Sequence, residues 1–586
     1  MVLFKNQFMK IVDDLKQALS RSLDGAGIRV SADDITLERP KELSHGDYAS
    51  GVALRYARQA GMSPLKLAEK IVAGLGKLNG VKSVKVVAPG FINFHLTPDT
   101  INSVLEEASA NEKAWGKNDS QKGSCVMVEY TDPNPFKEFH IGHLMSNAIG
   151  ESISRLVQYS GAEVKRANYQ GDVGLHVAKA IYARTYPSNV DNGVPWGVAY
   201  KMGNDLYESD PSHKKAVDEI NKKIYDKIDP EINKLYEAGR KESLAQFEII
   251  YEKLGMEPRK QSGNERFFDY YFFESETAPF GKRVVEEHPE IFEKSDGAIV
   301  YKGNEEKGLH TRVFINSKGL PTYEAKELGL AKKKYDTYSY DKSIVITGNE
   351  VNDYFRVLLD AMSKVYPELA VKTVHISHGM MRLSSGKMSS RTGDVITGES
   401  LIEELKGKAL ARAKESRADD ADILAEQIAV SAVKYQILRQ ASGKDIIFDR
   451  ERALSLEGDS GPYLQYAHAR AYAVVEKAKS QGVTFLNSQG DTLEPNDLPA
   501  RSAQAGVSRL VTRFPEVVLY AAEKLEPHLL VNYLIALAGA FNSWYAQVHI
   551  LDGSKDAPHK VAIVDAVRAT LKNGLWLLGI SAPEKM

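Results

Sequence analysis

The sequence predicts a multidomain α/β protein with an N-terminal α+β module, a parallel-sheet domain and a C-terminal all-α helical bundle. Its 586 residues exceed what a single hydrophobic core usually serves, so several domains are expected. Two strand–helix–strand patterns occupy the middle of the chain, and such units build parallel sheets. From about residue 400 onward the apolar spacing is helical throughout. The middle domain is therefore expected to be Rossmann-like.

Residues 1–110 are expected to form the N-terminal module. Apolar residues near the start recur at helical spacing with charges between them, which indicates an amphipathic helix rather than a signal peptide: Phe8, Ile11, Val12, Leu15 and Leu19. Strand-like runs follow at 84–87 and 91–96. The polar stretch 111–123 is interpreted as a linker.

The parallel-sheet domain is expected over 124–400. Its first unit has a strand at 125–130, a helix from about 140 to 159 and a strand near 164–169. Its second unit has a strand at 343–347, a helix at 352–365 and a strand at 371–377. A charged helical stretch at about 190–262 is interpreted as an insertion, and 401–586 as the helical bundle.

Composition excludes several classes of protein. Cys125 is the only cysteine, so neither an internal disulfide nor a thiolate zinc cluster can form, and we expect a cytoplasmic location. Its apolar neighbours suggest a small buried core residue. No run of about 18 apolar residues occurs, so we expect no membrane span. A net charge of −2 neither supports nor excludes a nucleic-acid partner.

The first motif reads Asp-Pro-Asn-Pro-Phe-Lys-Glu-Phe-His-Ile-Gly-His over 132–143. His140 and His143 begin a helix after a strand, and a helix N-terminus attracts phosphate through its free N–H groups. Three residues apart, the two rings fall on one side of the first turn. Gly142 between them allows close approach of a nucleotide. The alternative is a chance pattern on a surface helix.

The second motif reads Lys-Met-Ser-Ser-Arg over 387–391 and also follows a strand-like run. A Gly/Ser-rich loop that carries Lys387 offers a point charge and hydroxyl donors to a phosphate. The alternative is an ordinary flexible surface loop. Together, the two motifs suggest a site that binds ATP and transfers its adenylyl group.

In this order, the two motifs resemble the signatures of class I aminoacyl-tRNA synthetases. Further segments are similar to the arginyl-tRNA synthetase family: 129–135, 168–174, 321–327, 460–470 and the C-terminal ending 577–586, which finishes on methionine. The resemblance spans essentially the whole chain. It implies that 1–110 binds the tRNA elbow, that 124–400 is catalytic and that 401–586 binds the anticodon.

The resemblance implies an ATP-dependent arginine–tRNA ligase that forms arginyl-adenylate and then transfers arginine to the terminal adenosine of tRNA. ATP and Mg²⁺ are the expected cofactors, with no metal-ligating protein residues. Arginine, ATP and the tRNA for arginine are the expected partners, with no membrane, and we expect a monomer. The family typically needs bound tRNA even for the first step.

The resemblance also implies roles for individual residues. His140 and His143 would stabilise charge on the α-phosphate, while Lys137 and Lys387 would hold pyrophosphate. The ATP contacts are expected from Gly142, Met380, Met388, Ser389 and Ser390. The arginine contacts are expected from Glu129, Asn134, Tyr323, Glu327, Glu350 and Asn352. The tRNA contacts are expected from Tyr466, Tyr545 and Met586.

Physical chemistry supports parts of this assignment. Paired carboxylates suit a planar guanidinium, and Glu129 at the end of an apolar strand needs a partner. Without the resemblance, Glu327 would be a solvated helix acid, and Tyr466 and Tyr545 would be core residues as readily as stacking platforms for bases. The run Lys332–Lys334 is interpreted as a solvated face.

Three departures from the family pattern stand out. Glu327 occupies a position where aspartate is expected. An expected glutamine is missing near 348–353, so Glu350 or Asn352 is expected to replace it. Ser390 stands where the lysine loop has a second lysine, and Lys137 is expected to compensate.

Three rival functions are disfavoured by these residues. They are another class I synthetase, a nucleotidyltransferase with a similar His-x-x-His turn, and a tRNA-binding paralogue without catalysis. Pyrophosphate exchange into ATP that depends on arginine and tRNA would distinguish the ligase from all three.

Overall fold

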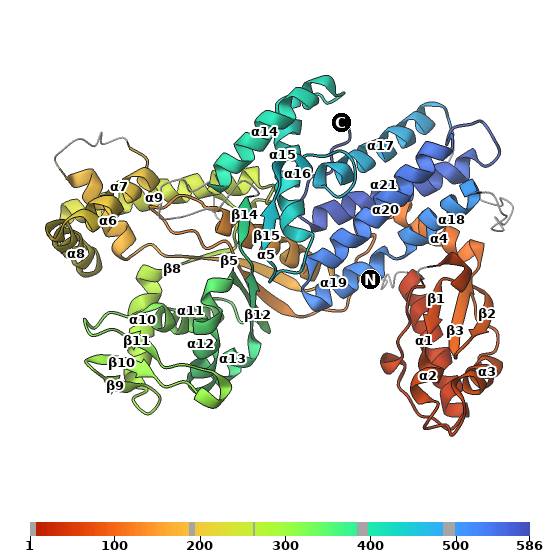
Figure 1. Ribbon diagram of the computed structural model, residues 1–586, viewed down its shortest axis with the longest axis horizontal. Coiled ribbons are helices and arrows are strands. Elements are labelled where there is room, and N and C mark those ends of the chain that lie inside the picture. Colours follow the sequence, from red (N-terminus) through yellow and green to blue (C-terminus); the bar gives the residue numbers. More distant parts are fainter. Residues whose placement is uncertain (1–6, 41, 187–193, 262–263, 384–396, 484–498) are drawn as a thin grey trace.

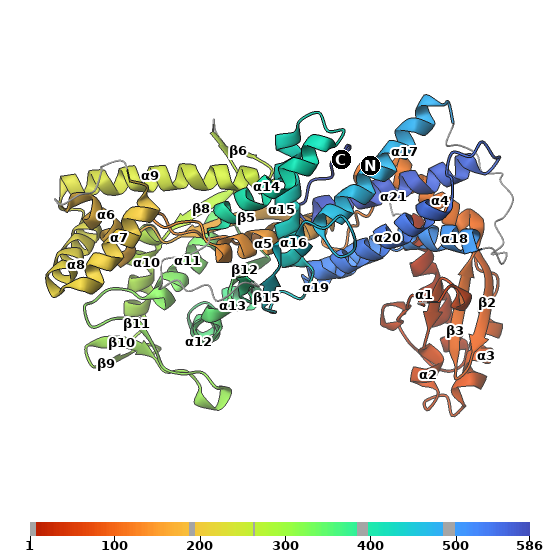
Figure 2. The same cartoon turned by 45° about the horizontal axis from the view of Figure 1, so that its top comes forward.

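The computed structural model describes residues 7–40, 42–186, 194–261, 264–383, 397–483 and 499–586. The chain is elongated around a central sheet, with the N-terminal module at one end and the helical insertion at the other (Figures 1 and 2). The C-terminal helices run along one side of the molecule between these ends. This arrangement confirms the predicted multidomain α/β fold.

The central sheet has five strands in the order β13-β12-β4-β5-β8, and every neighbouring pair is parallel. Their bounds are Thr373–His378, Lys342–Gly348, Cys125–Glu129, Glu163–Gln170 and Tyr270–Phe273. The predicted strands over 125–130, 164–169 and 343–347 are confirmed within a residue or two at their ends. Residues 371–372 instead close the short helix α13 (Pro367–Lys372), because Pro367 starts a helical turn before the strand.

Alternation along β4 explains how helices cover both faces of the sheet. Val126 and Val128 join the core formed with α5 (Ile141–Tyr159), whereas Met127 joins a cluster with Leu330 of α11 (Tyr323–Thr337). Successive strand residues point to opposite faces, so an unbroken apolar strand is buried on both sides. Helices α10 (Glu274–Glu287) and α12 (Asn352–Val365) pack beside α11.

A buried ion network joins β4, α5 and β5 below the end of the sheet. Glu151 of α5 accepts hydrogen bonds from Arg155 Nε (2.7 Å), Arg166 Nε (2.7 Å) and the Tyr130 hydroxyl (2.6 Å). Burial raises the pKa of the Glu151 carboxyl, but the two arginines outweigh burial and hold this pKa well below its usual range. These bonds fix the start of the loop that leaves β4.

The insertion is helical as predicted. The stretch 190–262 contains α7 (Trp196–Ser209), α8 (Pro211–Asp226) and α9 (Pro230–Lys253). The preceding helix, α6 (Leu175–Thr185), packs against α7 and α8. Two small sheets follow in the chain. After α9, β6 (Arg259–Gln261) pairs with β7 (Asn264–Arg266). After α10, β10 (Ala298–Tyr301) lies between β9 (Glu293–Ser295) and β11 (Arg312–Ile315).

The N-terminal module packs α1, α2 and α3 on an antiparallel sheet in the order β1-β3-β2. Their bounds are Gln7–Gly25, Val52–Tyr56 and Pro64–Gly74 for the helices, and Tyr48–Ser50, Phe91–Leu96 and Val81–Val87 for the strands. Ion pairs attach the module to the helical region: Arg39 to Glu516 (3.0 Å) and Arg509 to Asp47 (2.6 Å). The predicted domain boundaries remain a prediction.

The C-terminal region contains eight described helices. They are α14 (Gly398–Glu415), α15 (Ala421–Leu438), α16 (Arg450–Ala453), α17 (Gly461–Ser480), α18 (Pro499–Thr512), α19 (Phe514–Lys524), α20 (Pro527–Gln547) and α21 (Ala557–Leu577). Helix α4 (Pro98–Ala110) and the segment after it pack on α21, where Glu112 pairs with Arg568 at 2.6 Å. The stretch 111–123 is thus partly held against the helical region.

Three details differ from the expectations. β15 (Ile446–Phe448) interrupts the expected all-helical region by pairing with β14 (Met381–Leu383). Cys125 is only half-buried. By length and composition alone, α20 could cross a membrane, with a mean hydropathy of 1.2. However, Leu530, Leu534 and Phe541 on this helix are fully buried among neighbouring helices, as in the core of a globular domain.

Candidate active site

The predicted site residues meet at one edge of the central sheet. Because all five strands are parallel, their carboxyl ends share this edge, where ligands of open α/β sheets bind. Glu129 ends β4, His378 ends β13 and Glu274 follows β8. Residues far apart in sequence therefore converge there.

The loop between β4 and α5 has an unusual backbone. Thr131, Asp132 and Phe136 all have positive φ, at 78°, 47° and 69°. This region is uncommon for residues other than glycine, and each such residue costs about 1–3 kcal/mol. The surroundings hold the loop in place: the Thr131 N–H donates to Ser146 Oγ (2.9 Å) and Phe136 is fully buried. The loop is therefore held in one conformation that leads to the N-terminus of α5.

His140 and His143 form a stacked pair at the start of α5. His140 is the N-cap residue, and its ring centre lies 3.5 Å from that of His143. The His140 N–H donates to Nδ1 of His143 (3.2 Å), so a neutral His143 carries its proton on Nε2. Desolvation, followed by Lys137 and His378, lowers the pKa of His140 to about 4, and burial lowers that of His143 well below its usual range. Both rings are therefore neutral hydrogen-bond donors at pH 7.

Lys137 and His378 complete a basic cluster around the histidine pair. Lys137 is half-buried, its Nζ lies 5.1 Å from the centre of the Tyr200 ring, and burial lowers its pKa. His378 is buried, and its Nδ1 lies 2.8 Å from the Gly379 oxygen. The helix N-terminus and these side chains together provide a site for an anion.

A carboxylate cluster lies beside the basic one. Glu129 and Asp132 come from β4 and its loop, and Glu327 comes from α11. Burial, followed by the charge of Glu129, raises the pKa of Asp132 well above its usual range and that of Glu327 to about 8. Lys334 Nζ donates to Glu129 Oε2 at 2.6 Å. Among the described residues, no other lysine or arginine forms an ion pair with these three acids.

Glu274 and Asn134 link the two clusters. Glu274 accepts a hydrogen bond from Lys326 Nζ (2.6 Å), and its charge acts on both Lys137 and Glu327. A Cβ on Gly171 would lie 2.2 Å from Asn134 Oδ1 and 3.2 Å from Glu274 Oε1. Gly171 is therefore required for Asn134 to reach this position. The basic and the acidic cluster therefore lie next to each other, with Glu274 acting on both.

The remaining predicted residues lie around this site. Tyr323 begins α11 and is 64% exposed. Glu350 is exposed, folds back over Gly348 and raises the pKa of His378, which burial lowers overall. Asn352 begins α12 and is half-buried.

Two predicted ATP contacts can also be located. A Cβ on Gly142 would lie 2.9 Å from His140 Cε1, so this glycine makes room for the imidazole ring. Met380 is 48% exposed, and its N–H donates to Asp445 Oδ1 at 2.8 Å. Lys387, Met388, Ser389 and Ser390 lie outside the described residues.

Several residues of the site were missed by the sequence analysis. The interpretation of Lys334 as part of a solvated face was wrong, because this lysine is buried and paired with Glu129. Tyr354 was also missed: burial, followed by Glu327, Glu324 and Glu129, raises its pKa. Three lysines follow one another here, so the sequence does not indicate which of them is buried, and no sequence pattern indicates a role for Tyr354.

The three predicted tRNA contacts lie together in the helical region. The guanidinium carbon of Arg470 lies 4.7 Å from the centre of the Tyr466 ring and 5.0 Å from that of Tyr545. Arg470 also donates to Asn542 Oδ1 (2.6 Å), which holds it between the two rings. Tyr545 is 37% exposed, so it is not a core residue.

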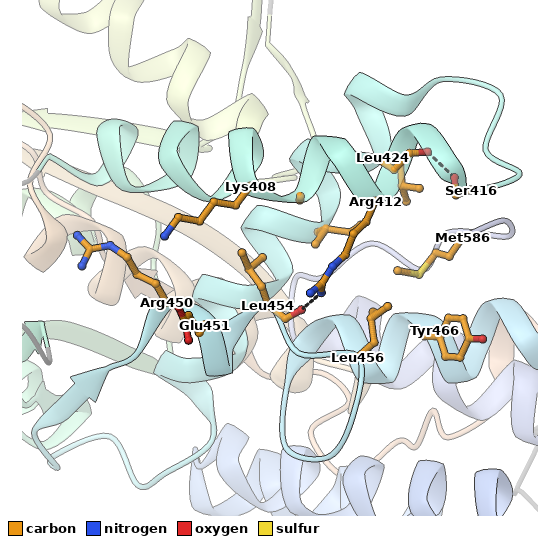
Figure 3. A pocket seen from close by; sticks show the side chains of 13 residues that line it. Lys408, Arg412, Ser416, Leu424, Arg450, Glu451, Leu454, Leu456, Tyr466 and Met586 are labelled. Carbon is orange, nitrogen blue, oxygen red and sulfur yellow. Dashed lines mark hydrogen bonds between the residues drawn. The ribbon is translucent and has the colours of Figure 1, made fainter.

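A cavity of about 390 Å³ opens next to Tyr466, between α14, α15, α16 and α17 (Figure 3). Met586, the last residue of the chain, lines it together with Tyr466. Lys408, Arg412 and Arg450 also line it: Lys408 and Arg450 both pair with Glu404, and the Arg412 guanidinium donates to the Leu454 oxygen (3.2 Å). An aromatic and basic lining of this kind suits a nucleotide base with its phosphate.

Three family models cover almost the whole chain. The one described as tRNA synthetases class I (R), catalytic domain, matches residues 101–450. The DALR anticodon binding domain matches residues 464–586, and the arginyl tRNA synthetase N-terminal domain matches residues 10–96. The order of the three matches follows the order of the regions described above.

Similar proteins and structures agree in length. The arginine–tRNA ligase of Clostridioides difficile is 29% identical over 98% of this chain and 100% of its own. Arginine–tRNA ligase 1 of Bacillus cereus is 30% identical over 94% of this chain and 95% of its own. The structure of Thermus thermophilus arginyl-tRNA synthetase shares the fold, with a TM-score of 0.76 and 24% identity over 97% of this chain and 99% of that one.

Proposed function

Because this chain belongs to the class I arginyl-tRNA synthetases, which charge tRNA with arginine at the expense of ATP, we propose that arginine and ATP bind at the two ends of the site described above. The guanidinium would bind at Glu129 and Glu327, and the phosphates at His140, His143 and Lys137. Arginine, ATP and tRNA are the substrates of the reaction.

One observation supports the placement of arginine above all others. Three buried or half-buried acids lie near a single lysine, which pairs with Glu129, so the acidic end has more carboxyl groups than its own cations can balance. Carboxylates in such a setting hold protons or bind a cation. A guanidinium supplies that cation and presents paired N–H donors to carboxylate oxygens. Tyr354, Tyr323 and Asn134 would then surround the rest of the amino acid.

In the first step, an arginine carboxylate oxygen bonds to the α-phosphorus of ATP, and the bond from that phosphorus to the pyrophosphate oxygen breaks. Neutral His143 can donate its Nε2 proton in a hydrogen bond to the charge that develops on the α-phosphate, and His140 stacks beside it. Lys137 stabilises the leaving pyrophosphate, with Lys387 as its expected partner. No protein nucleophile is required, because positioning and electrostatics suffice.

Mg²⁺ has no protein cage among the residues that the structure describes: no three His, Cys, Asp or Glu side chains form a group that could hold a metal. Mg²⁺ commonly binds substrate phosphates and keeps several waters. We therefore expect it to arrive with ATP.

In the second step, a ribose hydroxyl of the terminal adenosine of tRNA attacks the carbonyl of arginyl-adenylate, and AMP leaves. We propose that Tyr466, Tyr545 and Met586 contact the anticodon loop and that the N-terminal module contacts the tRNA elbow. The enzyme is expected to act as a cytoplasmic monomer.

Exchange of labelled pyrophosphate into ATP tests the assignment. We expect exchange with arginine in the presence of its tRNA, and none with lysine or glutamate. Equal exchange with lysine, or no exchange with any amino acid, would contradict it.

A further inference from the structure

Lys332, Lys333 and Lys334 are consecutive on α11 but lie in different environments. Lys332 pairs with Asp336 and Lys333 with Glu276, and all four side chains are partly exposed. Lys334 is 3% exposed, and its Nζ lies 2.6 Å from Glu129 Oε2. Successive helix residues point about 100° apart, so only one of the three can face the sheet.

Burial of this lysine is costly unless its charge is compensated. Although burial lowers it, the Glu129 carboxylate raises the pKa of Lys334 above its ordinary value, so the ammonium stays charged. The Glu129 side chain is itself only 2% exposed. The pair is therefore a buried ion pair, and removing one partner alone would leave the other charge unbalanced.

Other ionisable groups also face the pair and Glu327. They come from all the surrounding elements: Asp132 after β4, Tyr169 on β5, Glu274 on α10, Glu324 on α11, Tyr340 before β12 and Tyr354 on α12. Three of these six groups are additional carboxylic acids, and two of the three have cations of their own: Glu274 pairs with Lys326, and Glu324 with Arg312. Lys334 is therefore the cation that balances Glu129 before arginine binds.

We propose that Lys334 is a positioning residue for the arginine substrate: its ammonium holds one oxygen of Glu129 and leaves the other oxygen, with Glu327, to receive the guanidinium. This role rests on the proposed placement of arginine at Glu129. Lys334 itself does not need to touch the substrate. Without it, Glu129 would join two uncompensated acids and take up a proton more readily, and a protonated carboxyl binds a guanidinium poorly.

The test compares Lys334→Met with Lys333→Met, a matched change one residue away on the partly exposed face. Arginine KM, ATP KM and kcat are measured in tRNA charging between pH 6 and pH 8.5. For Lys334→Met we expect arginine KM to rise about tenfold or more at pH 7, because a protonated Glu129 would bind the guanidinium poorly. We also expect its pH dependence to move to higher pH, while ATP KM changes less than about threefold. Lys334→Arg should restore most of the arginine affinity, and Lys333→Met should behave as wild type.

A double-mutant cycle with Glu129→Gln separates a local role from a general one. If Lys334 acts through Glu129, the double variant binds arginine no worse than Glu129→Gln alone, because the two losses are not additive. The double variant also removes both charges of the pair, so it keeps the test valid if Lys334→Met alone fails to fold.

Four outcomes would count against these ideas in different ways. Equal effects of Lys334→Met and Lys333→Met on arginine KM would overturn the role of Lys334. So would additive losses in the cycle, or a rise of ATP KM as large as that of arginine KM. An unchanged arginine KM in Glu129→Gln would instead refute the placement of arginine itself.

Discussion

The backbone N–H of His140 donates to Nδ1 of His143 at 3.2 Å, and the two imidazole rings stack with their centres 3.5 Å apart. This bond has a chemical consequence, because it determines which nitrogen of a neutral His143 carries the proton. Nε2 is the nitrogen left to donate a hydrogen bond to a ligand. The helix cap and the proposed phosphate contact are thus made by opposite nitrogens of one ring.

Substitutions at His143 can separate these two functions. An asparagine amide can replace Nδ1 as acceptor, whereas a glutamine amide can reach the position of Nε2 as donor. We expect His143→Asn to lower kcat by about 10²–10³, the usual loss for one transition-state donor, with little change in arginine KM. His143→Gln should retain more activity. Steady-state charging assays check this, and a mainly raised arginine KM would show that His143 does not act on the phosphate.

Glu129→Gln tests the acidic end directly. The neutral amide keeps the shape of the side chain but removes the charge that faces Lys334 and the proposed guanidinium. We expect arginine KM to rise about tenfold or more, with ATP KM nearly unchanged. The same assay with ATP as the varied substrate serves as the internal control.

Arginine binding should depend on pH through Glu327. Burial and Glu129 raise the pKa of this carboxyl to about 8 before arginine binds, and a bound guanidinium would lower it. Binding therefore releases a proton below pH 8, so arginine affinity should increase from pH 6 to about pH 8 and then level off. Titration calorimetry in buffers of different ionisation enthalpy measures the released proton. Glu327→Gln should bind more weakly and lose this dependence on pH.

The cluster of Tyr466, Arg470 and Tyr545 in the helical region predicts an effect on tRNA binding alone. Tyr466→Ala and Tyr545→Ala should raise the KM for tRNA, since the stacking of a base on an aromatic ring contributes about 1–3 kcal/mol. Tyr466→Phe keeps the ring next to Arg470 and should raise the KM for tRNA much less. Pyrophosphate exchange at saturating tRNA should remain. If the alanine variants charge tRNA with an unchanged KM, the tyrosines do not contact it.

The network around Glu151 predicts a loss of stability. Glu151→Ala would leave Arg155 and Arg166 buried without their shared carboxylate, which typically costs about 3–5 kcal/mol. Urea unfolding followed by tryptophan fluorescence measures the change. Glu163→Gln, at the 60% exposed end of a surface pair with Lys165, should change the free energy of unfolding by less than about 0.5 kcal/mol.

Much of the fold was predictable because local patterns carry it. The strand over 125–130 and the helix at 140–159 follow from an unbroken apolar run and from 3.6-residue spacing, and the structure confirms both. The strand β15 was not predictable, since three residues gain their pairing only when Met381–Leu383 lies alongside. The need of Glu129 for a partner was foreseen, because a buried carboxylate without one is costly.

The sequence alone determined the order of the domains, the two motifs and the chemical types of the site residues, because these depend on neighbours along the chain. The tertiary structure decided which of them meet. His378, Glu274 and Tyr354 join the site only because five parallel strands end at one edge of the sheet. Likewise, three identical lysines stand at 332–334, and the rotation of α11 against the sheet alone decides that Lys334 meets Glu129. Such pairings depend on distances in space, which a linear pattern does not contain.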